Sequence, residues 1–150
     1  MEKKKRVLFI CVHNSGRSQM AEAFLRKSAG NKFDVESSGL EPQKINKIVI
    51  DVMKEINIDI SENTSDSVFD FYKQGRLYDY VITVCDESIE GQCPIFPGIT
   101  RRLHWAFPDP SSVSGTDEEK LAKVRKIRDD IHNRIMTWLT TLFPDTKTQC

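Results

Sequence analysis

Residues 6–18 read RVLFICVHNSGRS, and this stretch decides the fold that we expect. Residues 6–11 form an almost continuous run of β-branched, aromatic and aliphatic side chains, which is typical of a parallel strand covered on both faces. A polar loop follows, and residues 18–29 then carry apolar side chains at helical spacing. The stretch therefore predicts a strand, a tight loop and a helix in that order.

The rest of the chain repeats this alternation of strands and helices. Further strands are predicted at residues 33–37, 80–85 and 101–104, and further helices at residues 42–56 and 116–142. We expect the second helix to open at Pro42 and the last one to open on TDEE, a capping-box signature. Together these elements predict an α/β fold of three α/β/α layers with a four-stranded parallel sheet, formed by residues 1–150 as a single domain.

The composition limits the partners of the protein. The 150 residues contain 22 Lys plus Arg and 22 Asp plus Glu, so the formal net charge is zero. A general nucleic-acid-binding protein normally carries a net basic field, and no such partner is expected here. No apolar run approaches the roughly 18–20 residues that span a bilayer, so no membrane partner is expected either.

The N-terminus superficially resembles a signal peptide, because lysines precede the apolar run VLFICV. That run covers only residues 7–12, shorter than the apolar core of a signal peptide (about 7–15 residues), and polar His13 and Asn14 follow it. We therefore expect a cytoplasmic protein with reduced thiols. In that compartment its four cysteines are more often reactive or buried than joined in structural bridges.

Two cysteines end predicted strands. Cys11 closes the first strand and Cys85 closes the third, 74 residues later. The carboxyl ends of parallel strands share one edge of a sheet, and ligands of such sheets bind at that edge. We therefore expect Cys11 and Cys85 to lie together and to act together.

The loop after Cys11 has the form C-x5-R-S. Between a strand and a helix, such a loop wraps backbone N–H groups around a tetrahedral anion, with the helix N-terminus pointing at it. The planar guanidinium of Arg17 suits two oxygens of one anion. The expected oxyanion-binding residues are Cys11, Val12, His13, Asn14, Ser15, Gly16, Arg17 and Ser18. The alternative is a buried cysteine at a strand end, followed by an ordinary polar turn.

The chemistry expected of the loop depends on the Cys11 thiol. A positive environment favours the thiolate, which is the nucleophilic form, and Ser18 is placed to donate a hydrogen bond to it. Gly16 permits a backbone conformation that a β-carbon would resist. Asn14 is expected to hold the loop by bonding its own backbone.

The loop and its continuation, CVHNSGRSQMAEAF, resemble the low-molecular-weight tyrosine phosphatase fold family, and more closely its arsenate reductase branch. The extension SQMAE is typical of that branch. Three further segments resemble the family, and with them the resemblance covers nearly the whole chain: ESSGLEP at 36–42, IDISENTSD at 58–66 and RLHWAFPDPS at 102–111. Gly16 departs from the many members that carry a second cysteine in the loop. The resemblance implies a low-molecular-weight phosphatase-like fold.

Asp109 lies between two prolines in FPDP, which makes a rigid, exposed loop. On its own, an Asp in this setting is most often a turn residue. The resemblance implies that Asp109 is the general acid that protonates the leaving oxygen. Phosphatases of the family often carry tyrosine after this Asp-Pro pair, whereas Ser111 and Ser112 stand here, which favours a small inorganic substrate.

Cys85 and Cys93 are separated by seven residues, too many for a C-x-x-C redox pair. Zinc would need about four ligands at recognisable spacing, and none is evident. Taken alone, each could be a free structural cysteine. The resemblance implies a relay in which Cys11 attacks arsenic, Cys85 attacks Cys11 to release arsenite, and Cys93 then forms a disulfide with Cys85. The reductant it implies is thioredoxin, with glutathione or another small thiol as the alternative.

The resemblance also implies a potassium ion beside the loop, although no tightly bound cofactor is expected. Oxygen ligands suit this hard cation, and the matching residues are Asn14, Glu22, Ser37 and Asp66. The alternative is a hydrogen-bonded network that braces the loop. Cys150, at the extreme C-terminus, is expected to be frayed and without function.

The leading hypothesis is therefore a monomeric, thioredoxin-coupled arsenate reductase with weak phosphatase activity, which phosphate or sulfate inhibits by competition. A low-molecular-weight protein tyrosine phosphatase is the first alternative, because arsenate and phosphate share shape and charge. The second is a non-catalytic module that binds an anion or senses redox state. Cys85 and Cys93 count against the first alternative, and Asp109 counts against the second.

Overall fold

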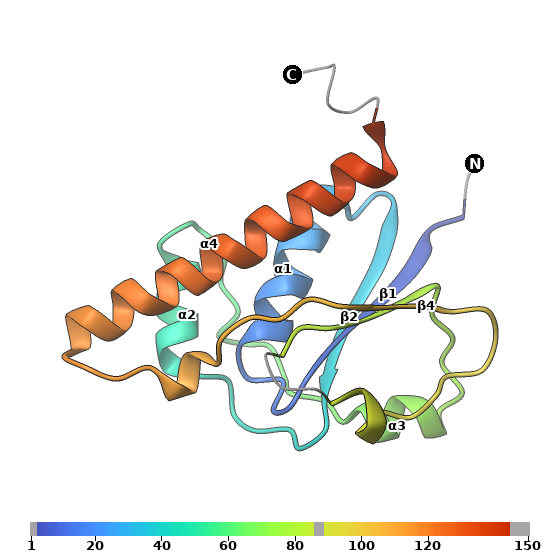
Figure 1. Cartoon of the computed structure of the whole chain (residues 1–150), viewed down its shortest axis with the longest axis horizontal. Coiled ribbons are helices and arrows are strands. Elements are labelled where there is room, and N and C mark those ends of the chain that lie inside the picture. The colour runs from blue at the N-terminus through green and yellow to red at the C-terminus, as the bar shows by residue number, and fades with distance from the viewer. Residues whose placement is uncertain (1–2, 86–88, 145–150) are drawn as a thin grey trace.

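The computed structural model describes residues 3–85 and 89–144. Four parallel strands form one sheet in the order β2-β1-β3-β4 (Figure 1). Their bounds are Lys5–Cys11 for β1, Phe33–Gly39 for β2, Tyr80–Thr83 for β3 and Arg101–His104 for β4. The sheet confirms the predicted α/β fold with four parallel strands.

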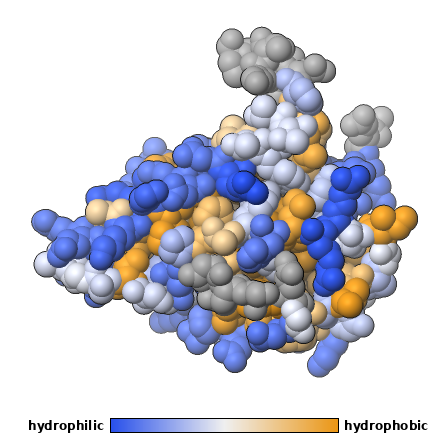
Figure 2. Space-filling model, in the orientation of Figure 1, coloured by the Kyte–Doolittle hydropathy of each residue, from blue (hydrophilic) through white to orange (hydrophobic). Residues whose placement is uncertain are grey.

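The helices cover the sheet unequally. Their bounds are Arg17–Ala29 for α1, Lys47–Lys54 for α2, Val68–Lys73 for α3 and Asp117–Leu142 for α4, with short 3-10 helices at Glu90–Gln92 and Pro110–Ser112. The helices α1, α2 and α4 pack together on one face of the sheet, and α3 lies on the other side (Figure 1). The outward surface of α4 is largely hydrophilic (Figure 2).

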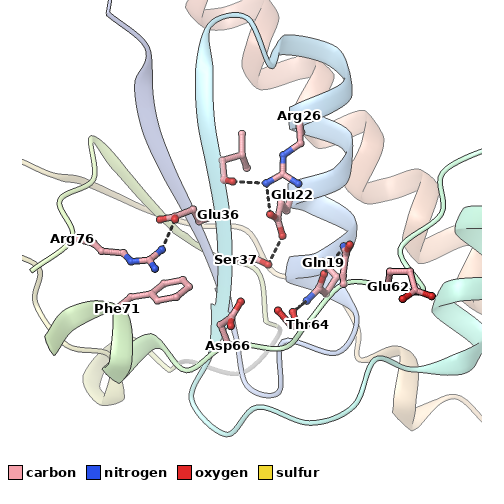
Figure 3. A pocket seen from close by; sticks show the side chains of 12 residues that line it. Gln19, Glu22, Arg26, Glu36, Ser37, Glu62, Thr64, Asp66, Phe71 and Arg76 are labelled. Carbon is pink, nitrogen blue, oxygen red and sulfur yellow. Dashed lines mark hydrogen bonds and ion pairs between the residues drawn. The ribbon is translucent and has the colours of Figure 1, made fainter. Parts of the chain in front are cut away.

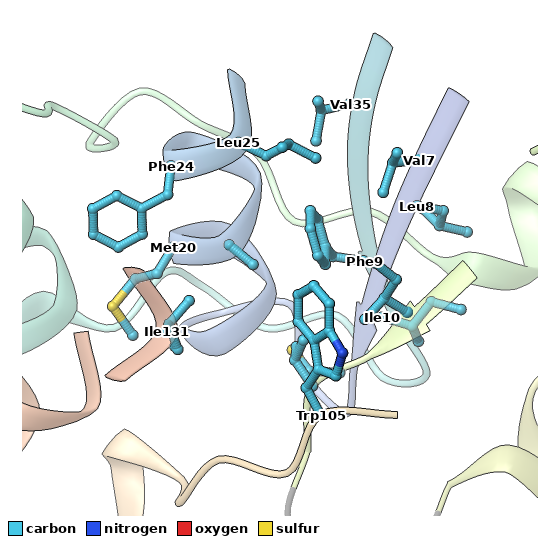
Figure 4. Close-up of a cluster of buried hydrophobic side chains, with 14 of the residues drawn as sticks. Val7, Leu8, Phe9, Ile10, Met20, Phe24, Leu25, Val35, Trp105 and Ile131 are labelled. Carbon is cyan, nitrogen blue, oxygen red and sulfur yellow. The ribbon is translucent and has the colours of Figure 1, made fainter. Parts of the chain in front are cut away.

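The core forms between the sheet and α1 and α4. Phe9 and Leu25 are completely buried, as are Met20 from α1 and Ile131 from α4, and Trp105 packs its ring 6.1 Å from that of Phe9 (Figure 4). Each large apolar side chain buried in this way contributes about 1.5–3 kcal/mol. The strand β1 is buried on both faces, as its continuous apolar run predicts.

The helix predicted at residues 42–56 begins later than expected. Pro42 does not open it; α2 starts at Lys47, where the Asn46 side chain accepts hydrogen bonds from Ile48 N (2.9 Å) and Val49 N (3.4 Å). The preceding residues are held elsewhere, because Gln43 N and Asn46 N donate to carbonyls of the loop after β1. Tertiary hydrogen bonds therefore override the local helical pattern.

The other predicted boundaries agree more closely. The helix α4 begins with the predicted capping box, in which Thr116 and Glu119 bond each other's backbone. The strand β3 ends at Thr83, two residues before the predicted end at Cys85. The sequence patterns missed α3, whose six residues are too few for a clear period.

Within the described ranges, no helix is both long enough and apolar enough to cross a membrane. Cys150 falls outside the described residues.

The strand β2 ends in direct contact with the loop after β1. A β-carbon added at Gly39 would lie 2.7 Å from Asn14 N, 2.8 Å from the Val12 oxygen and 2.9 Å from the His13 carbonyl carbon. These are backbone atoms, which a rotamer change cannot move. Only glycine therefore allows β2 and the loop to meet at this distance.

We predict that Gly39→Ala lowers the free energy of unfolding by about 1–3 kcal/mol, the usual cost of overpacking, because the loop must shift. Urea denaturation followed by circular dichroism measures this change. Gly91→Ala is the matched control, since a β-carbon there meets nothing within 4 Å and should change stability by less than about 0.5 kcal/mol. Equal stability of Gly39→Ala and the unmodified protein would contradict the close packing.

Candidate active site

The loop between β1 and α1 turns all its carbonyl groups outward. Each carbonyl oxygen of residues 11–16 accepts a hydrogen bond from outside this segment. In order from Cys11 to Gly16, the donors are Leu40 N (3.2 Å), Glu41 N (2.8 Å), Gln43 N (2.9 Å), Ser65 Oγ (3.0 Å), Asn46 N (2.9 Å) and Met20 N (2.9 Å). With the carbonyls engaged on the outside, the concave side of the loop is left to N–H groups, as an anion site requires.

The loop encloses a small pocket together with the segment that carries Asp109. Cys11, Arg17, Asp109 and Ser111 all line it, and its volume is about 10 Å³. Pockets for drug-sized organic ligands measure roughly 300–1,000 Å³. The structure thus brings Cys11, Arg17 and Asp109 together, as the sequence predicts, around a small space that is far below the size of a drug-sized ligand.

The sulfur of Cys11 is buried and strongly hydrogen-bonded. Ser18 Oγ lies 2.9 Å from it, and Asn14 N donates to it over 3.2 Å. Burial alone would raise the pKa of Cys11, but hydrogen bonds from the Cys85 side chain and from Ser18, with the charge of Arg17, outweigh burial and lower that pKa to about 6. At neutral pH Cys11 is therefore mainly a thiolate, the form expected from the sequence.

The direction of the Ser18 hydrogen bond follows from the amide of Asn14. Asp66 N can only donate, and it lies 3.0 Å from Asn14 Oδ1, so Asn14 Nδ2 must face the other way. That nitrogen donates to Ser18 Oγ (2.6 Å) and to Ser37 Oγ (3.0 Å). The Ser18 oxygen thus accepts from Asn14, and its own proton is left for Cys11.

Asn14 stabilises the loop differently from the prediction. Its backbone has a positive φ of 53°. We expected its side chain to bond its own backbone, but in the structure the side chain bonds Ser18, Ser37 and the backbone N–H of Asp66. Gln19 Nε2 adds bonds to the Asn14 carbonyl (3.1 Å) and to its Oδ1 (3.2 Å). Gln19 and Ser65 were not singled out from the sequence. The signals available were the position of Gln19 in the SQMAE extension and that of Ser65 in the segment IDISENTSD.

The four residues considered for potassium form a continuous hydrogen-bonded network. Ser37 Oγ donates to Glu22 (2.6 Å), and Arg26 Nη2 lies 2.5 Å from the same carboxylate (Figure 3). Glu22, Ser37 and Asp66 line an open pocket of about 430 Å³. The Asn14 amide turns N–H groups toward Ser37, and its oxygen already accepts from Asp66 N. N–H groups cannot bind a cation, and the Asn14 oxygen is already engaged. These groups therefore fit the hydrogen-bonded network and do not fit a potassium site that includes Asn14.

Arg17 connects the loop to the segment that carries Asp109. Its side chain is buried; Nη1 donates to the Phe107 carbonyl (3.0 Å) and Nη2 lies 3.8 Å from Asp109 Oδ2. Pro110 packs on Gly16, where an added β-carbon would lie 3.3 Å from its Cγ. The backbone of Gly16 has φ −149° and ψ −86°, outside the common α and β regions, so the expected conformational need for glycine stands beside this close contact.

The predicted meeting of Cys11 and Cys85 occurs at the sheet edge. Val84 N donates to the Ile10 carbonyl (3.0 Å). The hydrogen bonding between the β1 and β3 segments thus extends to Val84, the residue before Cys85. Cys85 is completely buried, and its side chain hydrogen-bonds Cys11. Cys93 is half-buried against the β3 and β4 edge, where it lines a pocket of about 180 Å³ with Arg102. Among the described residues, these three cysteines form no disulfide with one another.

Comparison with known proteins agrees with this geometry. The low molecular weight phosphotyrosine protein phosphatase family matches residues 6–148. An arsenate reductase of Halalkalibacterium halodurans is 44% identical over 138 residues, 92% of this chain and 97% of that protein.

Among solved structures, an arsenate reductase in its oxidized state has a TM-score of 0.74 and 33% identity, over 89% of this chain and 95% of that chain. A thioredoxin-dependent arsenate reductase of Corynebacterium glutamicum has a TM-score of 0.71 and 32% identity, over 93% of this chain and 62% of that chain. By its loop, its sheet order and these matches, the chain belongs to the low molecular weight phosphotyrosine protein phosphatase family.

Proposed function

We propose that this protein is a cytoplasmic, single-domain, monomeric arsenate reductase that converts arsenate to arsenite and is reduced by thioredoxin. One observation carries the proposal: the Cys11 sulfur, lying in an anion loop, is hydrogen-bonded by a second buried thiol, that of Cys85. Ester hydrolysis needs no such thiol, whereas reduction of the anion needs a second sulfur. The relatives named as arsenate reductases support the same substrate.

In the first step, the loop N–H groups and Arg17 bind arsenate, and phosphate or sulfate competes for the same site. The Cys11 thiolate attacks arsenic and forms a sulfur–arsenic bond. One arsenic–oxygen bond breaks, and Asp109 supplies a proton so that the oxygen leaves as water. Arsenic stays in its oxidised state during this step.

In the second step, the Cys85 thiol gives up its proton, which ends on an oxygen of the departing arsenite, and its sulfur attacks the sulfur of Cys11. A Cys11–Cys85 disulfide forms, the sulfur–arsenic bond breaks, and its electron pair stays on arsenic, which leaves as arsenite. Two electrons have then passed from the two thiols to arsenic. The hydrogen bond between the two side chains favours this attack, because it keeps the two cysteines side by side.

In the third step, Cys93 attacks Cys85, so that Cys11 is released as a thiolate and a Cys85–Cys93 disulfide remains. Thioredoxin then reduces this disulfide. The greater exposure of Cys93 than of Cys11 or Cys85 supports its place at the end of the relay.

A low-molecular-weight protein tyrosine phosphatase is the second candidate, because the same loop and acid would hydrolyse a phosphate ester. Arsenate is favoured by Ser111 in place of an aromatic residue and by the hydrogen bond between Cys85 and Cys11. Weak phosphatase activity is expected beside the reductase activity, since the loop binds both anions. A non-catalytic module would need neither Asp109 over the pocket nor paired thiols.

We predict that alkylation of Cys11 by iodoacetamide has an inflection near pH 6, because a thiol whose pKa is lowered to about 6 loses its proton as pH rises through that value. Ser18→Ala should move the inflection upward, since a hydrogen bond to a charged group contributes about 1.5–3 kcal/mol, roughly tenfold to hundredfold in the ionisation equilibrium. Mass spectrometry of the Cys11 peptide measures the rate. Ser28→Ala, an exposed serine of the same helix, is the control. An unmoved inflection in Ser18→Ala would exclude Ser18 as the donor.

We predict that the relay stops at a different point in each cysteine variant. Cys11→Ser should form no adduct and Cys85→Ser should release no arsenite. Cys93→Ser should release one arsenite per protein and then stall, because the Cys11–Cys85 disulfide is not resolved. Arsenite is counted per protein chain in single and multiple turnovers. Cys150→Ser is the control and should turn over like the unmodified protein; sustained turnover by Cys93→Ser would remove Cys93 from the relay.

The proposed function as a whole is tested by NADPH oxidation with arsenate, thioredoxin and thioredoxin reductase. Oxidation should require arsenate and disappear in Cys85→Ser. The same variant should still hydrolyse p-nitrophenyl phosphate, because hydrolysis needs no second thiol. No oxidation with thioredoxin or with glutathione and glutaredoxin, together with brisk ester hydrolysis, would establish the phosphatase alternative instead.

A further inference from the structure

The two carboxylate oxygens of Asp109 have different surroundings. Oδ1 accepts two hydrogen bonds from one residue, Ser111, through its backbone N–H (2.9 Å) and its hydroxyl (2.8 Å). Oδ2 faces the anion loop and lies 3.8 Å from Arg17 Nη2. Asp109 and Ser111 both line the small anion pocket. One oxygen is thus held by the turn, and the other faces the reacting groups.

The turn that carries Ser111 is fixed on both sides. Asp109 caps the 3-10 helix Pro110–Ser112, and Ser112 N donates to the Asp109 carbonyl (3.0 Å). Pro110 has a restricted φ and is buried against Gly16. The backbone bond to Oδ1 is an ordinary cap bond that any residue other than proline would make at position 111. The hydroxyl bond is additional and depends on the side chain.

We propose that Ser111 is a positioning residue for the acid: its hydroxyl holds Oδ1 of Asp109, so that the catalytic proton resides on Oδ2 and is delivered from there. This assignment rests on the proposed function, in which Asp109 protonates the leaving oxygen. An oxygen that already accepts two hydrogen bonds is a poor site for the acid proton, since that proton would point toward donors. The carboxyl group therefore keeps one orientation before and after proton transfer.

The chemical step is then defined by atom. The Cys11 sulfur forms its bond to arsenic, an arsenic–oxygen bond breaks, and the proton of Asp109 Oδ2 passes to that oxygen, which leaves as water. The negative charge that remains on Asp109 is stabilised by the two Ser111 donors and by Arg17. A larger aromatic residue at position 111 would extend the rim of the pocket, but it would lose the short hydroxyl contact.

The test is a double-mutant cycle on the rate constant of arsenite formation in a single turnover. Ser111→Ala keeps the backbone N–H and removes only the hydroxyl, so the rate should fall roughly threefold to tenfold, the effect of one hydrogen bond. Ser111→Thr should restore most of the rate, because it restores the hydroxyl. In an Asp109→Ala background, Ser111→Ala should have no further effect, since Ser111 acts only through the acid.

Two controls separate positioning from a general change in structure. The affinity for inorganic phosphate should stay within about twofold in Ser111→Ala, because the loop that binds the anion is untouched. Ser112→Ala should react like the unmodified protein, since Ser112 bonds Asp109 through its backbone only, among the residues that the structure describes.

Each opposing result has a distinct meaning. An unchanged rate in Ser111→Ala, or an equal loss with and without Asp109, would overturn the positioning role. An unchanged rate in Asp109→Ala would overturn it as well, and would leave the reductase proposal standing on Cys11 and Cys85. Absence of arsenite from the unmodified protein would overturn the proposed function itself, and the same cycle on phenyl phosphate hydrolysis would then decide the role of Ser111.

Discussion

The structure of the site depends on one constraint, namely that every carbonyl oxygen of residues 11–16 must be satisfied outside the loop. The donors come from α1, from the segment that leads into α2, and from Ser65. A buried carbonyl without a partner would cost free energy comparable to a lost hydrogen bond. Once these bonds are made, the N–H groups are left on the concave side, where a tetrahedral anion can bind. Anion binding is thus a consequence of how the outside of the loop is packed.

The pKa of Cys11 is lowered by hydrogen bonds from the neutral side chains of Cys85 and Ser18, as well as by the charge of Arg17. Burial opposes the thiolate, so donors must compensate for the lost water. The Asp66 N–H fixes which way the Asn14 amide points, and this fixes the direction of the Ser18 hydroxyl. A backbone group 55 residues away in the sequence therefore decides which atom donates to the sulfur. In a dry site such a chain of hydrogen bonds is stronger than it would be in water.

Two other parts of the chain complete the site, each brought there by a different feature. The sheet order places β3 beside β1, so Cys85 leaves the sheet next to Cys11. The Asp109 segment is held by Arg17 and by the contact of Pro110 with Gly16. Because Cys11, Cys85 and Asp109, the proposed nucleophile, second thiol and acid, lie on three separate segments, small changes in one segment can alter one proposed step without destroying the fold.

The sequence by itself determined the strand–helix alternation, the parallel sheet, and the meeting of Cys11 with Cys85, since hydrophobic period and strand ends are local properties. It also placed Arg17 in the anion loop and, through the family resemblance, Asp109 at the same site, and both line one pocket with Cys11. Only the tertiary structure showed where α2 begins, that residues 68–73 form the helix α3, and which residues the Asn14 side chain hydrogen-bonds. It also revealed the roles of Gly39 and Gln19, and it showed the hydrogen bonds of the Glu22 and Ser37 network that the sequence had offered as an alternative to a potassium site. These features depend on hydrogen bonds and backbone contacts between residues far apart in the chain. Local sequence patterns do not show which distant residues will contact each other.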